Sequence, residues 1–162
     1  PKRAATTFIF KSVILRYANV VGPRARHGVL VDFITKLKKN PRELEILGDG
    51  TQEKSYIYVE DAVEATMRAL RYFIDHKICM EVFNIGSEDS ITVKEIADIV
   101  VGKLGLRNVK YIYMQSTEGG RGWPGDVKRM LLSIQRLKEK TGWEPKLKSK
   151  EALEATLKSL LK

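Results

Sequence analysis

The sequence predicts an α/β fold with some mixed strand pairing. Stretches with strand-like and helix-like patterns alternate along the chain, which is typical of this class. Two of the predicted strands are nearly continuous apolar runs, as in strands that are covered on both faces. No internal repeat or long linker divides the 162 residues, of which 43% are hydrophobic. We therefore expect residues 1–162 to form a single domain with its own core.

The first part of the chain is predicted to run strand, helix, strand. Ser12–Val21 is an apolar run that we expect to be covered on both faces, and Gly22 and Pro23 end it. Gly28–Lys39 is predicted to be a helix, and Leu44–Leu47 is predicted to be a short strand. The helix has apolar residues at helical spacing: Leu30, Phe33, Ile34 and Leu37.

The stretch Gly48–Asp61, GDGTQEKSYIYVED, combines a turn, a basic residue, a strand and a helix start. Its two glycines favour a tight turn, because glycine reaches positive φ without a steric penalty. Ser55–Val59 alternates like a half-buried strand, and the acids that follow suit the first turn of a helix. An ordinary loop–strand–helix connection would explain these features, and a polar ligand platform would explain them too.

The second part of the chain continues the alternation. We expect a helix over residues 60–75 that packs through Val63, Met67, Leu70 and Phe73, followed by a buried strand at Val82–Ile85. The next helix begins with a capping box formed by Thr92 and Glu95. The remaining predicted elements are a strand at 108–114, a glycine-rich loop at 116–125, and helices at 133–141 and 149–161.

Composition limits the classes of function. The net charge of +9 suits nucleic acid or small phosphorylated ligands, but the basic residues are scattered among acids and form no nucleic-acid motif. We therefore expect no nucleic-acid partner. The single cysteine, Cys79, excludes an internal disulfide, suits a cytoplasmic protein, and is predicted to be buried. No apolar run is long enough to span a membrane.

Four segments in order carry a family resemblance: Arg16–Pro23, Gly48–Asp61, Val82–Ser87 and Gly119–Val127. Together they resemble the C-terminal half of the NAD-dependent nucleotide-sugar epimerases and dehydratases, which are extended short-chain dehydrogenase/reductases and include UDP-glucose 4-epimerase. The resemblance extends from about Lys11 to the C-terminus. It implies the remnant of a Rossmann-type sheet plus a small mixed α/β substrate-binding subdomain.

The resemblance implies roles for residues at the end of the first strand. Asn19 would bind the nucleotide sugar near its diphosphate, and Tyr17 and Val20 would approach the nicotinamide of NAD. Asn19 would otherwise only cap the strand end. Lys54 stands where relatives usually carry an arginine that grips the diphosphate; a lysine supplies charge without the bidentate fork. The alternative for Lys54 is a solvated strand lysine.

The glycine-rich loop resembles a segment in which an arginine binds phosphate and an aspartate binds ribose hydroxyls. Arg121 and Asp126 would take these roles, although their spacing of five differs from the commoner three. Two carboxylate oxygens can accept hydrogen bonds from two ribose hydroxyls. The alternative for Asp126 is a turn or helix cap.

Two features of the resembling proteins are not expected here. They are the glycine-rich GxxGxxG turn that receives the NAD pyrophosphate after a first strand, and the YxxxK pair that moves a proton. No tyrosine in the chain has a lysine four residues later. We therefore expect no catalytic residues and no metal site, no stable NAD binding by the chain alone, and a protein that binds a nucleotide sugar such as a UDP-sugar but is inactive by itself. The alternatives are a non-catalytic small-ligand or protein-interaction module, or one chain of a split epimerase or dehydratase.

The predicted strands also bear on assembly. Ser12–Val21 and Val82–Ile85 are suited to the interior of a larger parallel sheet, so an unpaired edge should remain in this chain. Such an edge favours association with another chain. We expect a homodimer, or pairing with a separate NAD-binding chain.

Overall fold

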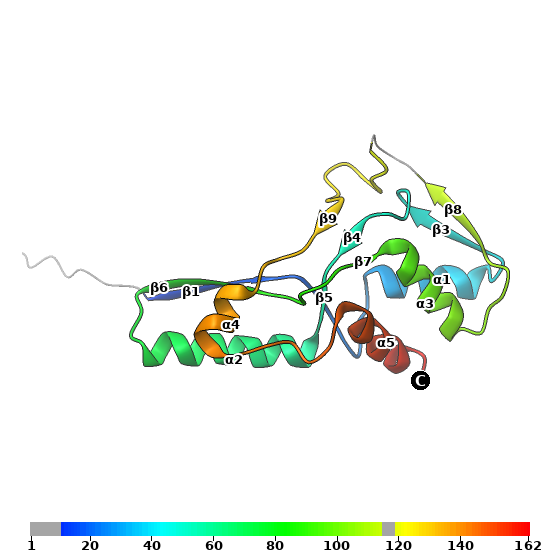
Figure 1. Ribbon diagram of the computed structural model, residues 1–162. Helices are drawn as coiled ribbons and strands as arrows, with labels where there is room; N and C mark the ends of the chain where they lie inside the picture. Colours follow the sequence, from blue (N-terminus) through cyan, green and yellow to red (C-terminus); the bar gives the residue numbers. More distant parts are fainter. Residues whose placement is uncertain (1–10, 115–118) are drawn as a thin grey trace, which may run out of the picture.

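Strands and helices alternate through residues 11–114 and 119–162, the part of the chain that the computed structural model describes (Figure 1). This confirms the predicted α/β class. The strands are β1 (Ser12–Tyr17), β2 (Asn19–Val21), β3 (Glu43–Leu47), β4 (Glu53–Lys54), β5 (Tyr56–Tyr58), β6 (Met80–Ile85), β7 (Ile91–Thr92), β8 (Lys110–Met114) and β9 (Arg129–Met130). The helices are α1 (Val29–Lys39), α2 (Val59–Asp75), α3 (Val93–Lys103), α4 (Gln135–Thr141) and α5 (Ser149–Leu160).

The strands form small sheets with mostly parallel pairing. Three pairs are parallel: β1 with β6, β2 with β5, and β3 with β8. The short strand β4 pairs antiparallel with β7 on one side and parallel with β9 on the other. The expected mixed pairing is therefore confirmed, and it occurs at β4, within Gly48–Asp61.

Two hydrophobic cores lie on either side of β5. The first contains the buried face of α1, as predicted, together with α3, α5 and the inward side chains of β3. The second lies between β6, α2 and α4 (Figure 1). Successive side chains of a strand point to opposite faces, so Tyr56 packs in the first core and Ile57 in the second. Whether the two cores unfold together as one domain stays a prediction.

Helix α2 packs through a different face from the predicted one. Its buried residues include Ala62, Ala65 and Ala69, whereas Val63 and Met67 are more than half exposed. Of the four residues predicted to pack, only Phe73 is buried. The helix has two apolar faces, and the alanine face allows its backbone to approach β1 and β6 closely. The spacing alone could not show which face would be covered.

The apolar run Ser12–Val21 was wrongly predicted as one strand covered on both faces. It breaks at Ala18 into β1 and β2, which pair with different strands. Ile14 is 40% exposed and Val20 is 45% exposed. Cys79, predicted to be buried, is also exposed, because it precedes β6 at the end of a turn.

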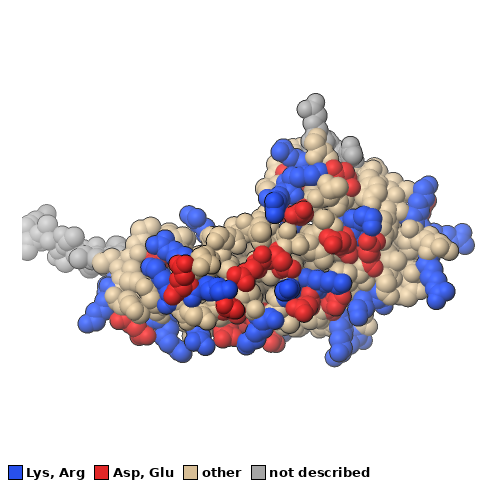
Figure 2. Space-filling view, in the orientation of Figure 1, with Lys and Arg blue, Asp and Glu red and all other residues tan. Residues whose placement is uncertain are grey.

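The charged surface agrees with the scattered charges of the sequence. Figure 2 shows basic and acidic side chains interspersed over the face in view, without a continuous basic patch. Among the described helices, none combines the length and the apolar character that crossing a membrane requires.

Helix α3 begins with the predicted capping box. The Thr92 hydroxyl accepts a hydrogen bond from the Glu95 N–H at 3.1 Å, and the Glu95 carboxylate accepts one from the Thr92 N–H at 2.8 Å. These bonds satisfy backbone donors that have no partner within the helix.

We expect Thr92→Ala to lower the free energy of unfolding by about 1 kcal/mol, because it removes the N-cap acceptor. Urea unfolding would measure the loss. Thr35→Ala is the matched control: Thr35 lies on the exposed side of α1, where its hydroxyl bonds to the Val31 carbonyl, so its loss should change stability by less than about 0.5 kcal/mol. Equal losses in the two variants would contradict the capping role.

Candidate functional site

The turn Gly48–Gly50 is followed by an extended segment that lies along one side of a pocket. Gly48 and Gly50 have positive φ values of 85° and 79°, as the glycine pattern predicted. A Cβ at Gly48 would collide with the Gln52 amide and the Gly120 carbonyl oxygen, so glycine lets the two loops meet here. Beyond the turn, side chains two residues apart share a face, and Gln52, Lys54 and Tyr56 all line the same pocket.

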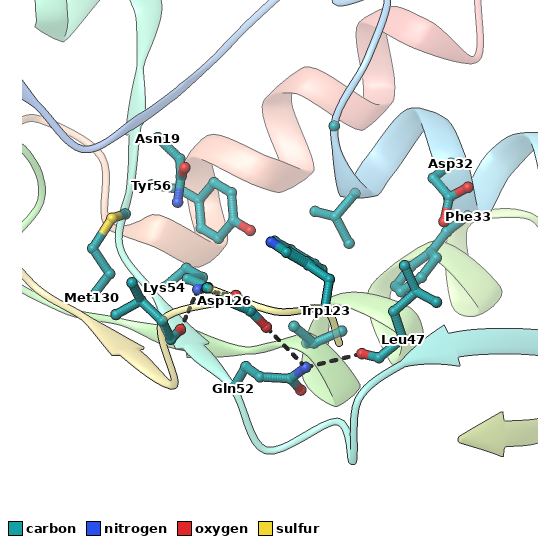
Figure 3. A pocket seen from close by; sticks show the side chains of 15 residues that line it. Asn19, Asp32, Phe33, Leu47, Gln52, Lys54, Tyr56, Trp123, Asp126 and Met130 are labelled. Atoms are coloured by element: carbon teal, nitrogen blue, oxygen red, sulfur yellow. Dashed lines mark hydrogen bonds and ion pairs between the residues drawn. The ribbon is translucent and has the colours of Figure 1, made fainter. Parts of the chain in front are cut away.

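This pocket, with a volume of about 530 Å³, is shown in Figure 3. Its wall combines segments that are far apart in sequence: the start of β2, the start of α1, the β3–β5 segment, and the loop before β9. Most of the lining side chains are apolar. The lining residues are Asn19, Gly28, Val29, Asp32, Phe33, Leu47, Gln52, Lys54, Tyr56, Val93, Trp123, Gly125, Asp126, Val127 and Met130.

Lys54 and Asp126 bind each other inside this pocket. The Lys54 Nζ lies 2.9 Å from Asp126 Oδ1, and the two side chains are 15% and 2% exposed. Lys54 also donates to the Val127 carbonyl oxygen. The other carboxylate oxygen, Oδ2, accepts from the Gly122 N–H at 3.2 Å and from Gln52 Nε2 at 3.5 Å. Both oxygens of Asp126 are thus occupied by donors from the protein.

Asp126 is held in its charged form. Burial acts to raise the pKa of its carboxyl, but the hydrogen bonds from Lys54, Gly122 and Gln52 outweigh burial and lower the pKa below its ordinary value. Burial raises the pKa of the Tyr56 hydroxyl to about 12. Tyr56 is therefore neutral at physiological pH, and its hydroxyl points into the pocket (Figure 3).

Asn19 lies at the start of β2 beside the pocket. Its Nδ2 donates to the Ser55 carbonyl oxygen at 3.2 Å, which fixes the side chain on the pocket wall. The amide oxygen, Oδ1, can then accept a hydrogen bond from a ligand. Asn19 thus lines the pocket while its amide binds the Ser55 carbonyl oxygen, and its contact with a ligand stays a prediction.

The other predicted site residues lie away from this wall. Tyr17 is exposed, and its hydroxyl lies 2.6 Å from the Thr66 hydroxyl on α2. Val20 lines a smaller adjacent cavity together with His27. Arg121 is exposed in the loop and is not among the residues that line the main pocket. The predicted roles of these three residues stay predictions.

The loop predicted at 116–125 is described only from Gly119 onward. The chain was expected to lack the GxxGxxG pattern, and this was wrong for the spacing, because Gly119, Gly122 and Gly125 fit it. They lie between β8 and β9, however, and no helix begins after them. A pyrophosphate turn needs a helix N-terminus at that point, so this spacing does not form the turn that binds a dinucleotide.

Sequence reasoning missed several residues of the wall, among them Gln52, Tyr56 and Trp123. The alternation of a strand could have identified the first two, since they flank Lys54 at a period of two. Trp123 stands three residues before Asp126, where the resemblance would place an arginine. Within the described ranges, no cluster of three or more histidine, cysteine or acidic side chains could hold a metal ion.

The chain is similar to proteins of a known family. Residues 2–86 match the NAD dependent epimerase/dehydratase family. A putative UDP-glucose 4-epimerase from Methanocaldococcus jannaschii is 35% identical over 144 residues, which are 86% of this chain and 42% of the relative.

Solved structures show the same likeness. The crystal structure of a UDP-galactose 4-epimerase superimposes with a TM-score of 0.80 at 42% identity, over 93% of this chain and 45% of that protein. The UDP-glucuronic acid 4-epimerase of Bacillus cereus, solved with UDP-glucuronic acid and NAD, gives a TM-score of 0.74 at 27% identity, over 92% and 45% of the two chains. This chain therefore spans less than half the length of these relatives.

The ion pair predicts a pH-dependent contribution to stability. Asp126→Asn should lower the free energy of unfolding at pH 7 by about 1–3 kcal/mol, because it weakens buried charge-assisted hydrogen bonds. The pKa of Asp126 is lowered on folding, so this contribution is present above the unfolded pKa of about 4 and is lost as the pH falls through the folded pKa. Urea unfolding of both proteins between pH 7 and pH 2 would show the difference shrinking below about pH 4.

Asp32→Asn is the matched control. Asp32 forms a partly exposed ion pair with Lys36 at 2.8 Å, one turn along α1. Such pairs contribute less than about 1 kcal/mol. A difference between wild type and Asp126→Asn that stays constant from pH 7 to pH 2 would contradict the account.

Proposed function

The chain belongs to the NAD-dependent epimerase/dehydratase family, and we propose that its pocket binds the nucleotide part of a nucleotide sugar. One observation carries the proposal: Asn19, Lys54 and Asp126, chosen from sequence as nucleotide-sugar residues, line one pocket. They come from three segments separated by 35 and 72 positions in the chain. A relative of the same fold was solved with UDP-glucuronic acid and NAD, so we propose a UDP-sugar as the ligand.

The polar groups of the pocket suit different parts of such a ligand. Asn19 Oδ1 can accept a hydrogen bond from a hydroxyl or a ring N–H, and the neutral Tyr56 hydroxyl can donate or accept. Lys54 adds positive charge at one side of the wall, although Asp126 offsets most of its field. The apolar remainder of the wall excludes water from the ligand, which strengthens these few contacts.

We propose that this chain supplies binding and not hydride transfer. In the reaction of such enzymes, NAD supplies the hydride chemistry. The described residues do not fit NAD by themselves, because they contain no glycine turn between a strand and a helix of the GxxGxxG kind. The chain also contains no YxxxK pair. We therefore propose that turnover needs an NAD-binding half besides these 162 residues, as in a split epimerase or dehydratase.

An uncovered apolar surface supports association with another chain. Within the described residues, β1 pairs only with β6. Helix α4 packs against α2 and β6. Exposed apolar side chains lie on β1 and along α2: Ile14, Tyr17, Val63, Met67, Leu70 and Ile74. We propose that a second copy of the chain covers this surface, pairing at the β1 edge; a separate NAD-binding chain is the alternative occupant.

We also propose that the protein is cytoplasmic, because its single cysteine, Cys79, is an exposed free thiol, which fits a reducing compartment.

We expect the chain to bind UDP-glucose or UDP-galactose with a Kd between micromolar and millimolar, because only part of a full binding site is present. Asn19→Ala should weaken binding by about 3- to 10-fold, the effect of one hydrogen bond. Titration calorimetry would measure both.

Asn84→Ala is the matched control for this test. Asn84 Nδ2 donates to the Ser133 carbonyl oxygen at 2.9 Å, an amide–carbonyl bond like that of Asn19 but outside the pocket. Its loss should leave affinity unchanged. No heat of binding with either sugar nucleotide at millimolar concentration would rule out the proposed function.

Light scattering after size exclusion should give the mass of a dimer at about 100 μM chain. Met67→Lys should shift the mass toward the monomer, because it places a charge in the uncovered apolar surface. Leu131→Lys makes the same change at a residue 40% exposed between β9 and α4, and it should leave the dimer intact. A monomeric wild type at this concentration would mean that the surface does not bind a second copy.

A further inference from the structure

Building on the proposed function, we propose that Trp123 holds the ligand by stacking on a planar ring, and that the Lys54–Asp126 ion pair positions the loop that carries it. The ring is the base of the nucleotide. Lys54 and Asp126 are then positioning residues and not the groups that grip phosphate and ribose. This assigns a role to a residue that the resemblance did not provide.

Trp123 is largely exposed, unlike the other tryptophan of the chain. It is 51% exposed and belongs to neither hydrophobic core, whereas Trp143 is 3% exposed and packs in the second core. Figure 3 shows the Trp123 indole extending into the pocket. An aromatic face that stays open to solvent inside a pocket is suited to stacking on another ring.

The loop around Trp123 is fixed at several points. The Asp126 N–H donates to the Trp123 carbonyl oxygen at 3.1 Å, which closes a tight turn that begins at Trp123. Asp126 is in turn held by Lys54 and by the Gly122 N–H. On the side before Gly122, the Asp49 N–H donates to the Gly120 carbonyl oxygen at 3.0 Å.

A second ion pair strengthens this attachment. Lys128 Nζ lies 2.5 Å from Asp49 Oδ2, so Lys128, two residues beyond Asp126, is tied to the Gly48–Gly50 turn. The Trp123 backbone is thus held from both sides before any ligand arrives. A preorganised contact of this kind costs less conformational entropy on binding.

The charges of the pocket wall argue against binding of the ligand through its phosphates. The charged residues of its wall are Asp32, Lys54 and Asp126, which are one cation and two anions. The single cation is already paired with Asp126 at 2.9 Å. A diphosphate would therefore meet a wall without an unpaired positive charge, and the phosphates would lie toward solvent.

The remaining polar groups also favour a base over a sugar. Gln52 and Lys54 both donate to Asp126, which leaves the neutral groups of Asn19 and Tyr56, together with the buried and unpartnered Gln52 Oε1, as the remaining polar side-chain groups. A sugar ring carries several hydroxyls that each need a partner. A nucleobase has two apolar faces and few polar edge groups, and it fits an apolar wall that includes Phe33, Leu47 and Met130.

Intrinsic fluorescence can test this assignment directly. The chain has two tryptophans, and in Trp143→Phe the remaining one, Trp123, reports on the pocket. The Trp143 ring nitrogen has no hydrogen-bond partner among the described residues, so the change removes no hydrogen bond. In this background, uridine and UDP should quench the fluorescence with Kd values within about 10-fold of each other, and inorganic pyrophosphate should not compete.

Calorimetry with UDP completes the test. Trp123→Ala should weaken binding by about 5- to 100-fold, the range measured when an aromatic side chain is removed from under a base. Trp123→Phe should stay within about 5-fold of wild type, and Leu131→Ala, outside the pocket, should match wild type. Circular dichroism would establish that each variant is folded.

The positioning role of Lys54 has its own readout. In the Trp143→Phe background, Lys54→Met should make Trp123 more accessible to acrylamide and weaken UDP binding, while Lys54→Arg, which keeps the charge, should restore both.

Wild-type affinity in folded Trp123→Ala, or competition by pyrophosphate as strong as that by UDP, would overturn the stacking role while leaving the proposed function intact. Absence of any UDP or UDP-sugar binding to the folded wild type would instead defeat the proposed function, and this inference with it.

Discussion

The ion pair between Lys54 and Asp126 is the constraint on which the site depends. It connects the β4–β5 segment to the loop before β9 across 72 residues of sequence, with both side chains largely removed from water. Removing a charge from water is unfavourable unless partners replace the lost hydration. Here the Gln52 amide and the Gly122 N–H supply them. The loop is therefore held where it closes one side of the pocket.

The same segment also organises the fold. In β5, Tyr56 packs in one core and Ile57 in the other, so the strand that carries the site joins the two hydrophobic cores. Ligand contacts built on a strand between two cores are held more rigidly than contacts built on a free loop. By contrast, β1 and the nearby side of α2 have apolar residues that neither core covers. The protein thus combines a well-supported pocket with an uncovered apolar surface.

Much of the fold could be predicted from local patterns. The stripe Leu30–Leu37, the capping box at Thr92 and the glycine turn at Gly48 are each determined by neighbours in sequence, and each is confirmed. Burial of α2 could not be predicted, because both of its faces are apolar and only the tertiary contacts decide between them. The same limit applies to the site: the family resemblance singled out Lys54 and Asp126, but their contact with each other depends on the path of a distant loop.

A crystal structure of the chain with bound UDP would test the central claim most directly. The decisive quantity is the distance between Lys54 Nζ and the Asp126 carboxylate, now 2.9 Å. If the pair positions the loop that carries Trp123, it stays closed in the complex, and the base lies against the Trp123 ring. A pair that opens, with Lys54 turned to the diphosphate and Asp126 to the ribose hydroxyls, would contradict the account.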